Sequence, residues 1–300
     1  RVLFRSLVIV ANPNAPTGLA APAENLQTIA RRISGVLLVD EAYVDFADAD
    51  AMVLARSEPN VLVARTLSKS YGLAGLRFGA NATHIVLPQD SVLLKKPEGL
   101  GHAEAAVLTD GALTSWHFLH HVGRVRAGQR VLILAGAGSL GSAAVQIAAA
   151  AGAHVTASAS ARNADLVASL GAERVIDYAR QDPLAAGAHD LVFDTIGVAS
   201  FARARRVLAP GGTYMSPVLT ARLLWDMLRS RIAGGRRARF TAVGLETPKT
   251  LRAALADVLG AIAADRFTPV MDRSYPLADL VAAQTYVAAG HKRGNVVVTS

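Results

Sequence analysis

Cysteine is absent from this 300-residue sequence, and so are long apolar runs. Without cysteine the chain forms no disulfide, presents no thiol nucleophile and binds no zinc through cysteine. The alanine-rich segment at 148–151 is soon interrupted by Gly152 and His154, far short of the roughly 20 apolar residues that span a bilayer. The opening RVLFRSLVIVA has the charge and apolar core of a weak secretion signal, but NPN at 12–14 follows instead of a small-residue cleavage site. We therefore expect a cytoplasmic protein without a membrane partner.

Aromatic side chains make up only 5% of the chain, whose net charge is +8. The basic excess gathers at 203–206 and at 229–239, where only Phe201 and Phe240 lie nearby. Proteins that bind nucleic acid commonly interleave aromatic side chains with basic ones, and that pattern is missing here. We therefore interpret the arginine clusters as solvated faces of a helix and a loop, and we expect no nucleic-acid partner.

The first 79 residues alternate between apolar runs and helical segments. Short apolar runs at 6–11, 36–40 and 60–64 end in polar or turn residues, as buried parallel strands do. Between the first two runs, residues 23–34 place their apolar side chains on one helical face. The order of strand, helix, strand, helix, strand predicts a piece of parallel α/β sheet.

Three motifs follow one another in this part of the chain: NPNAPTG at 12–18, VDEAYVDF at 39–46 and RTLSKSYGLAGLRFG at 65–79. In this order and at these separations they resemble the fold-type-I aminotransferases that use pyridoxal phosphate, and histidinol-phosphate aminotransferases most closely. The sequence departs from the family at Ala15, where an asparagine often binds the phenolic oxygen of the cofactor.

The resemblance implies roles for five residues. Lys69 would form the Schiff base, and Asp40 would pair with the pyridinium nitrogen. Tyr43 would hold the phenolic oxygen, while Thr66 and Arg77 would hold the phosphate. The family's earlier segment and later domain, which supply further contacts, are not found in the sequence. Losing three charge-assisted hydrogen bonds of about 1.5–3 kcal/mol each lowers cofactor affinity by orders of magnitude, so we expect a relic without bound pyridoxal phosphate.

A glycine-rich turn follows an apolar strand in the second part of the chain. We expect the strand at 129–135, a helix at 139–151 and a second strand at 154–158. The glycines that stand in G-x-G-x-x-G register are Gly136, Gly138 and Gly141. In this context the first two let the backbone turn and approach a pyrophosphate, while the third lets helix and strand pack closely. The helix amino terminus adds N–H groups that attract phosphate, so the turn predicts a dinucleotide-binding domain.

The end of the second strand indicates which nucleotide binds. An NAD enzyme usually places a carboxylate there for the ribose 2′-hydroxyl, whereas the residues at 158–162 are SASAR. Ser160 and Arg162 would contact a 2′-phosphate directly, so we expect NADPH to bind more tightly than NADH. The alternative is that Arg162 is an ordinary surface arginine at the start of a helix.

Three further segments flank this turn: THIVLPQDSVLLKKPEGLGHAEAA at 83–106, LTDGALTSWHFLH at 108–120 and YPLADLVAAQTYVAAGHKRGNVVV at 275–298. Together they resemble the medium-chain dehydrogenase/reductase superfamily, and within it the zinc-independent quinone oxidoreductases and related NADP-dependent reductases. The resemblance implies that Tyr178 contacts the 2′-phosphate and that Thr114 touches the nicotinamide end. The segments at 194–197 and 209–212 would line the nicotinamide or serve as helix caps and turns.

Three histidines, His117, His120 and His121, have the i, i+3, i+4 spacing of a helical metal site. No carboxylate or cysteine completes the set nearby in the sequence. We therefore predict ordinary packing and no bound metal.

These patterns combine into one fold prediction. We expect an α/β protein in which an incomplete aminotransferase fragment at 1–79 precedes a Rossmann doubly wound parallel sheet at 105–265. A partial catalytic domain of the reductase would occupy 80–104 and 266–300, with strands within 82–96 and 267–299.

The function that we predict is metal-independent reduction of a small quinone, enone or aldehyde by NADPH, with a general acid that the sequence does not identify. Two alternatives stay open. One is a pyridoxal-phosphate aminotransferase of the histidinol-phosphate type, for which Lys69 is decisive. The other is a chimeric product that only binds nucleotide. The expected partner is a small-molecule substrate, and a homodimer is left open.

The two parts meet near Gly79 and Ala80 without a Gly/Ser/Pro-rich linker, and each neighbour is cut within a domain. The first six residues, RVLFRS, can be encoded by a sequence that resembles the end of a common sequencing adapter. We therefore predict an assembled chimera rather than a bifunctional enzyme. A single DNA read across codons 70–90 is the observation that decides between the two.

Overall fold

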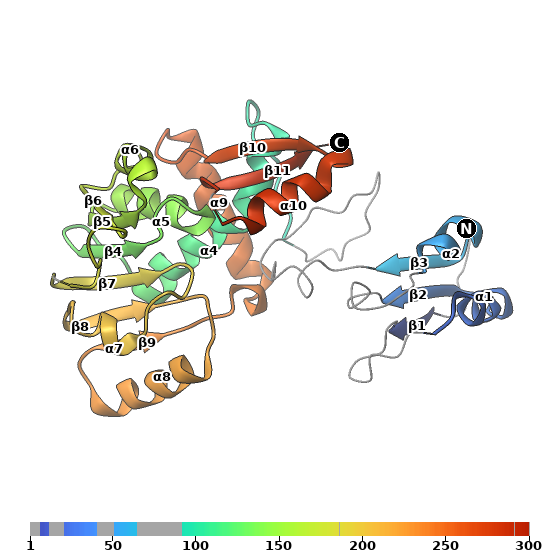
Figure 1. Ribbon diagram of the computed structural model, residues 1–300, viewed down its shortest axis with the longest axis horizontal. Coiled ribbons are helices and arrows are strands. Elements are labelled where there is room, and N and C mark those ends of the chain that lie inside the picture. Colours follow the sequence, from blue (N-terminus) through green and yellow to red (C-terminus); the bar gives the residue numbers. More distant parts are fainter. Residues whose placement is uncertain are drawn as a thin grey trace. The chain divides into compact units, whose positions relative to one another are not determined.

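The computed structural model describes residues 7–11, 21–40, 51–64, 92–185, 187–290 and 292–299. The chain divides into two compact units, Arg1–Phe78 and Gly79–Ser300. Both contain parallel strands connected by helices (Figure 1), which confirms the predicted α/β fold class. The predicted seam and four predicted site residues lie outside the described residues: Tyr43, Thr66, Lys69 and Arg77.

The first unit contains a three-stranded parallel sheet and two helices. The strands stand in the order β1 (Leu7–Ala11), β2 (Val36–Asp40) and β3 (Val61–Ala64), and the helices are α1 (Ala23–Arg32) and α2 (Met52–Ser57). The predicted strands and the predicted first helix are confirmed, with ends that differ by one or two residues.

Apolar side chains from both helices and from β2 and β3 form the core of this unit. The members that are almost completely buried include Leu26, Ala30, Leu37, Val39, Leu54 and Val61. A polar contact also joins α1 to the residue after α2. Glu58 accepts hydrogen bonds from Arg31 and Gln27, each 2.8 Å long, and these bonds lower the pKa of the Glu58 carboxyl. The two helices are therefore tied together on the polar side as well.

A six-stranded parallel sheet organises the second unit (Figure 1). The strands stand in the order β6, β5, β4, β7, β8, β9, so the chain starts in the middle and builds first one half and then the other. This confirms the predicted doubly wound arrangement, in which ligands bind at the carboxyl ends of the strands where the winding reverses. The strand bounds are Arg130–Leu134 (β4), His154–Ala159 (β5), Arg174–Asp177 (β6), His189–Asp194 (β7), Leu208–Met215 (β8) and Arg237–Arg239 (β9).

Helices connect these strands and cover both faces of the sheet. Their bounds are His102–Ala106 (α3), Gly111–His117 (α4), Ser139–Ala150 (α5), Ala164–Ser169 (α6), Phe201–Ala204 (α7), Ala221–Ala233 (α8), Pro248–Ala263 (α9) and Leu280–Ala288 (α10). Single 3-10 turns lie at Val107–Thr109, Ala161–Asn163, Val243–Leu245 and Leu277–Asp279, and a π-helical turn, Phe118–Gly123, extends α4. The strand and helix predicted on either side of the glycine turn are confirmed.

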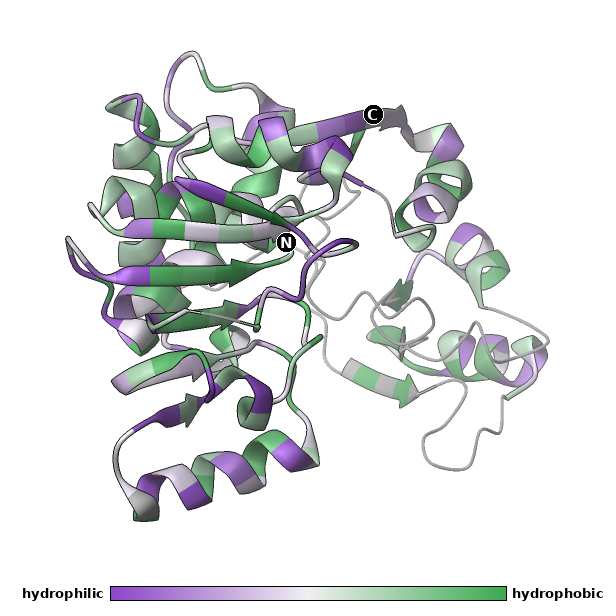
Figure 2. Cartoon of the chain, turned by 60° about the vertical axis from the view of Figure 1, so that its left-hand side comes forward, coloured by the Kyte–Doolittle hydropathy of each residue, from purple (hydrophilic) through white to green (hydrophobic). Residues whose placement is uncertain are grey.

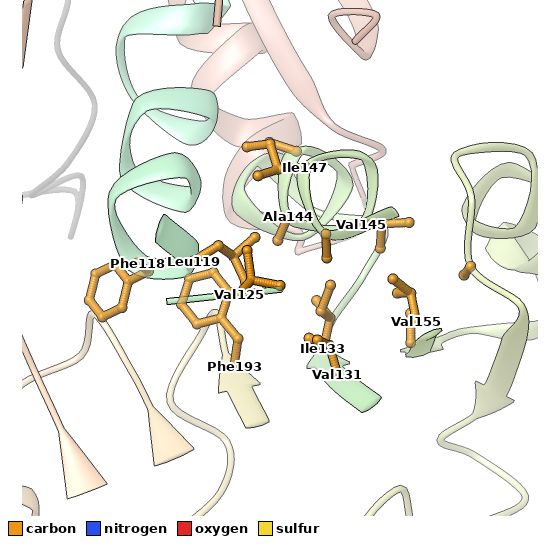
Figure 3. Packing of buried hydrophobic residues seen from close by; sticks show 14 of the residues in the cluster. Phe118, Leu119, Val125, Val131, Ile133, Ala144, Val145, Ile147, Val155 and Phe193 are labelled. Carbon is orange, nitrogen blue, oxygen red and sulfur yellow. The ribbon is translucent and has the colours of Figure 1, made fainter. Parts of the chain in front are cut away.

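Strand β4 is buried on both faces. Val131 and Ile133 point into the cluster formed with α4 and α5 (Figure 3), whereas Leu132 and Leu134 belong to the cluster under α7 and α8. On the first side the rings of Phe118 and Phe193 stack with centroids 5.1 Å apart. Because both faces of a central parallel strand are covered, its sequence is continuously apolar instead of alternating.

A smaller parallel pair of strands, β10 (Met271–Pro276) and β11 (Asn295–Thr299), lies within the expected range 267–299. Of the range 82–96 in which strands were expected, only residues 92–96 are described, and they form no strand; the rest of that prediction lies outside the described residues. The segment runs into Pro97, which has no N–H for a strand ladder, and into a turn at Gly99 with φ of 85°. The side chain of Lys96 bonds to the Leu100 carbonyl across this turn.

Two histidines of this unit are buried with one ring nitrogen unpartnered. His117 lies in α4 and His189 begins β7, and neither Nδ1 has a hydrogen-bond partner. Burial lowers the pKa of both imidazoles. The charge of Glu246 opposes this lowering of the pKa at His117, whereas the charge of Arg130 lowers the pKa of His189 further. Both side chains are therefore neutral in the folded chain at neutral pH.

We expect acidification to destabilise the second unit. A histidine whose pKa is lower in the folded state than in the unfolded state stabilises the fold above its unfolded value of about 6.5, and this contribution is lost as the pH falls through the folded value. The Tm should fall between pH 7.5 and pH 5, by about 2–4 °C for each kcal/mol lost. His189→Leu should flatten this dependence, whereas His102→Gln, at an exposed position, should leave it unchanged. If the Tm of both variants changed with pH to the same extent, the pH dependence could not be assigned to the buried His189.

Candidate functional site

The glycine turn between β4 and α5 is held by hydrogen bonds to the end of β5. The Gly136 N–H donates to the Ser158 carbonyl at 2.7 Å, and the Ala135 N–H donates to the Ser158 hydroxyl at 3.1 Å. The turn then closes on itself, because the Gly138 N–H donates to the Ala135 carbonyl at 3.2 Å. Ala135 adopts a left-handed φ of 57°, which is unusual for a residue with a side chain.

The three glycines of the turn meet different demands. A Cβ added to Gly141 would lie 2.0 Å from the Ala135 carbonyl oxygen, and one added to Gly136 would lie 3.0 Å from the Ala157 Cβ. At Gly141 the backbone itself leaves no room for a side chain, whereas at Gly136 the side chains of Ala157 and Val167 crowd the position. A Cβ on Gly138 would meet only the Ala135 oxygen at 3.6 Å, which is an ordinary contact. Nothing among the described residues requires glycine at 138, so its missing side chain leaves room for a ligand.

Helix α5 begins directly after Gly138 and presents its amino terminus at this turn. The first N–H groups of a helix have no partner within the helix and carry about half a positive charge. Gly138 is the N-cap and provides no side-chain cap, and the first turn of α5 holds no acidic residue. The end of the helix is thus suited to bind an anionic group.

The carboxyl-terminal segment lies against the same turn. The Gly294 N–H donates to the Ala137 carbonyl at 2.7 Å, and the Ser139 hydroxyl donates to Asn295 Oδ1 at 2.5 Å. Gly294 has a φ of 62°, and a Cβ there would lie 2.4 Å from the Val270 carbonyl oxygen. Segment 292–295 is therefore fitted to the turn by backbone contacts that only glycine permits at its centre.

Lys292 precedes this contact and is a partly buried cation. Its Nζ donates to the Gly294 carbonyl at 2.7 Å. Burial lowers the pKa of the ammonium group, while Asp110 and Asp272 oppose that effect. The sequence analysis assigned no site residue in this segment. The signal that could have found it is the run of basic residues at 291–293 immediately before a glycine.

The end of β5 gathers the residues predicted to select the nucleotide. Ser160 is half-buried, Arg162 is exposed, and Tyr178 is 58% exposed with its N–H bonded to the Ala159 carbonyl at 3.2 Å. Arg293 joins them, since its guanidinium donates to the Arg162 carbonyl at 3.1 Å. Two guanidinium groups thus belong to this corner of the unit.

The neighbouring strand β6 ends in a carboxylate, Asp177. Its Oδ1 accepts the Ala179 N–H at 3.1 Å, and its Oδ2 lies 3.7 Å from Arg180 Nε. Asp177 therefore caps the turn that follows β6 and has an arginine beside it.

Helix α4 packs against the start of α5 and carries Thr114. The Ser115 hydroxyl donates to the Leu140 carbonyl at 2.8 Å, and a Cβ on Gly111 would lie 2.3 Å from the Ser139 Oγ. The half-buried Thr114 is thereby held beside the amino terminus of α5. The structure brings this predicted residue to the same region as the glycine turn.

Asp194, at the end of β7, has a structural role that the sequence analysis did not resolve. Its completely buried carboxylate accepts N–H bonds from Gly197, Val198 and Ala199, at 2.8, 3.1 and 2.7 Å. The Tyr214 hydroxyl donates to the same carboxylate at 3.0 Å. Burial and the nearby Asp194 charge raise the pKa of Tyr214. Of the two roles proposed for 194–197, Asp194 thus serves as the cap of a turn.

In the first unit only one of the predicted cofactor residues lies within the described ranges. Asp40 is the last residue of β2, the central strand, and its backbone pairs with Ala11 and Ala64 on either side. This position at a carboxyl strand end is where ligands bind in parallel α/β sheets. The predicted roles of Asp40 and of the other four residues stay predictions.

Comparisons with known proteins also divide the chain into two parts, as the sequence motifs do. The family model for aminotransferase class I and II matches residues 4–92, and the model for zinc-binding dehydrogenase matches residues 170–298. The chain resembles two enzyme families in succession. Both resemblances inferred from the motifs are thereby confirmed. The first match extends past Gly79 and Ala80, so the position of the seam stays a prediction.

The relatives match only in part. The first part is 55% identical over 73 residues to the histidinol-phosphate aminotransferase of Geobacter sulfurreducens, covering 24% of this chain and 21% of that protein. The chain is also 31% identical over 227 residues to the mitochondrial NAD(P)H oxidoreductase RTN4IP1 of Mus musculus, covering 68% of this chain and 57% of that protein. It thus spans about a fifth of the first relative and little more than half of the second.

Solved structures match the same doubly wound fold. The quinone oxidoreductase from Coxiella burnetii superposes with a TM-score of 0.61 at 28% identity, covering 69% of this chain and 63% of that chain. A mycobacterial protein solved with NADPH superposes with a TM-score of 0.59 at 27% identity, covering 69% of this chain and 67% of that chain. The likeness to quinone oxidoreductases that the motifs predicted is confirmed.

The zinc in the name of the dehydrogenase family finds no matching ligand set. Zinc sites use three or four side chains with sulfur, nitrogen or carboxylate ligands. The sequence has no cysteine, and within the described ranges no group of three or more His, Asp or Glu residues gathers closely enough to hold a metal. His117 instead faces Glu246 at 3.3 Å and stacks on His121 with ring centroids 4.9 Å apart. The residues described do not fit a zinc ion.

We expect the glycines at 138 and 141 to respond differently to alanine. Gly141→Ala should lower the free energy of unfolding by at least about 2 kcal/mol, because its Cβ would collide with backbone. Gly138→Ala should cost less than about 1 kcal/mol, since only the weaker N-cap propensity of alanine acts there. Urea unfolding of the two variants checks this difference. Equal losses would show that the turn is not packed as described.

Proposed function

We propose that the second unit binds NADPH and serves as the nucleotide-binding part of an oxidoreductase that reduces a small quinone, enone or aldehyde without a metal. The observation that carries this proposal is the end of β5, where Ser160 and Arg162 stand in place of a carboxylate, beside the anion-binding end of α5. The likeness to a quinone oxidoreductase and to a mycobacterial protein solved with NADPH supports it.

The pyrophosphate of the nucleotide would lie over Gly138. This position has space that the chain itself does not need, and the amino terminus of α5 begins there. Backbone N–H groups at a helix start bind such an anion without any basic side chain. The contact of Gly294 with Ala137 would keep the turn in the shape that this binding needs.

The 2′-phosphate would lie at the corner formed by Ser160, Arg162, Tyr178 and Arg293. A guanidinium group is always charged and offers a fork of donors that matches phosphate oxygens. Hydroxyl groups of serine and tyrosine can complete the set of donors. A 2′-hydroxyl in the same place would gain none of the charge-assisted bonds, so this corner favours NADPH over NADH.

Bound NADPH would supply the hydride, and the residues of this chain would orient it. Thr114 and the turn held by Asp194 and Tyr214 would flank the nicotinamide end. This fixes the ring relative to the sheet, because that turn is anchored by four hydrogen bonds to one buried carboxylate. Oxidation of NADPH in the presence of a quinone distinguishes a reductase from a chimera that only binds nucleotide.

We expect Arg162→Ala to weaken NADPH binding about ten- to hundredfold and to leave NADH binding nearly unchanged. The loss corresponds to one charge-assisted contact of roughly 1.5–3 kcal/mol. Titration of both nucleotides, followed by protein fluorescence, measures the ratio of the two dissociation constants. Arg174→Ala is the matched control, because Arg174 is exposed at the opposite, amino-terminal end of the sheet. Equal affinity of the parent chain for both nucleotides would refute the assignment.

A second candidate function is suggested by the 55% identity of the first part to a histidinol-phosphate aminotransferase. The match covers only 21% of that protein, so most of a cofactor site of that kind has no counterpart in the match. We expect no stable aldimine between pyridoxal phosphate and Lys69. Visible spectra at micromolar cofactor test this, with Lys69→Ala as the control. A saturable absorption band that Lys69→Ala abolishes would establish an aminotransferase-type site instead.

A further inference from the structure

Lys292 differs from most other cations of the second unit because it is partly buried. Most arginines and lysines of this unit are exposed, whereas burial lowers the pKa of the Lys292 ammonium group. Its surroundings are those of a protein interior, and no helix within the described ranges is long and apolar enough to cross a membrane. A buried ammonium group costs free energy unless an opposite charge lies close to it.

The ammonium group of Lys292 lies near the start of helix α5. Its Nζ donates to the Gly294 carbonyl at 2.7 Å, and Gly294 forms an isolated parallel bridge with Gly138, the N-cap of α5. The central strands of the six-stranded sheet are hydrophobic over most of their length (Figure 2), and this bridge lies beyond the carboxyl end of β4. One carbonyl group therefore connects Lys292 to the position proposed for the pyrophosphate.

The charges around Lys292 compensate it only in part. Asp110, the N-cap of α4, and Asp272 of β10 both raise the pKa of the ammonium group, but burial outweighs them. Asp272 also accepts the Tyr286 hydroxyl at 2.7 Å and the Arg293 N–H at 2.9 Å. The amino terminus of α5 carries partial positive charge, which repels a cation. This arrangement favours the arrival of an anion beside Lys292.

We propose that Lys292 is the counter-charge of the nucleotide's pyrophosphate, and that its ammonium group turns from the Gly294 carbonyl to a pyrophosphate oxygen when NADPH or NADH binds. The inference rests on the nucleotide site proposed above and assigns a residue to the part that both nucleotides share. A lysine carries rotatable donors on a flexible stem, so this turn needs no movement of the backbone. Arg293 then serves the 2′-phosphate and Lys292 serves the pyrophosphate.

This contact makes the affinity for both nucleotides depend on pH. Burial lowers the pKa of Lys292 in the free chain, whereas the negative charge of a bound pyrophosphate raises it. Binding therefore takes up a proton at any pH between these two values. The affinity is full below the pKa of the free chain, falls as the pH rises through that value, and levels off above the pKa of the complex.

Titrations with three ligands test the position of Lys292. Lys292→Met should weaken the binding of NADPH and of NADH by the same factor, about ten- to hundredfold, because one charge-assisted contact to a shared group is lost. Arg162→Ala, in contrast, should weaken NADPH alone. Adenosine 2′-phosphate has no pyrophosphate and should bind Lys292→Met as it binds the parent, which also shows that the variant is folded. Lys249→Met, at an exposed lysine of α9, is the matched control and should bind all three ligands as the parent does.

A conservative variant separates charge from shape. Lys292→Arg keeps the positive charge at every pH used, because a guanidinium group does not lose its proton. Its affinity for NADPH at pH 7 should stay within about threefold of the parent's. Between pH 7 and pH 10 the affinity of the parent should fall more steeply than that of Lys292→Arg.

Failure of this inference can be told from failure of the proposed function. A parent that prefers NADPH, with Lys292→Met binding both nucleotides as the parent does, would overturn the role of Lys292 alone. A loss confined to NADPH would overturn it too, because it would place Lys292 at the 2′-phosphate. A parent that binds neither nucleotide would overturn the proposed function and this inference together. If Lys292→Met also loses adenosine 2′-phosphate, the pH profiles decide, and coincident profiles of the parent and Lys292→Arg would overturn the inference.

Discussion

The close approach of helix α5 to the turn before it is the constraint on which the second unit depends. A side chain at Gly141 would lie 2.0 Å from the Ala135 carbonyl oxygen and 2.7 Å from the Gly136 Cα, so helix and turn are in backbone contact. The same turn is bonded to Ser158 at the end of β5. Because helix, turn and strand share these contacts, the N–H groups at the helix start and the residues that follow β5 hold fixed positions relative to one another.

The carboxyl-terminal segment, although distant in the sequence, also holds this turn and helix in place. Ser139 bonds to Asn295 across 156 positions of the chain, and Gly294 bonds to the Ala137 carbonyl. Arg293 is thereby carried to the end of β5, where it bonds to the Arg162 carbonyl. A site built in this way is complete only when β11 has paired with β10. We therefore expect loss of the last strand to damage the proposed nucleotide site before it affects the core around β4.

The sequence predicts the elements near the glycine turn well, and it fails where distant segments meet. Apolar runs and glycine spacing locate β4, α5 and β5, because these signals lie within about 30 neighbouring residues. The place of Arg293 at the end of β5 depends on a contact with Arg162, 131 positions away in the chain, which no local pattern encodes. Asp194 is ambiguous for a similar reason, since its partner Tyr214 comes from the next strand. Residues 92–96, the described end of the range 82–96 in which strands were expected, form no strand, because Pro97 and the turn at Gly99 follow them.

The two parts of the chain differ in how their cofactor sites are distributed. The residues proposed to hold the nucleotide lie at 114, 136–162, 178 and 293, all inside one unit with a core on both faces of its sheet. We therefore expect nucleotide binding to persist without the rest of a reductase. The aminotransferase-like match covers only 21% of its relative, so we expect no complete pyridoxal-phosphate site in the first unit. We therefore expect nucleotide binding to be the separable property, whereas hydride transfer also needs a substrate pocket. That asymmetry is why the proposed function rests on the second unit.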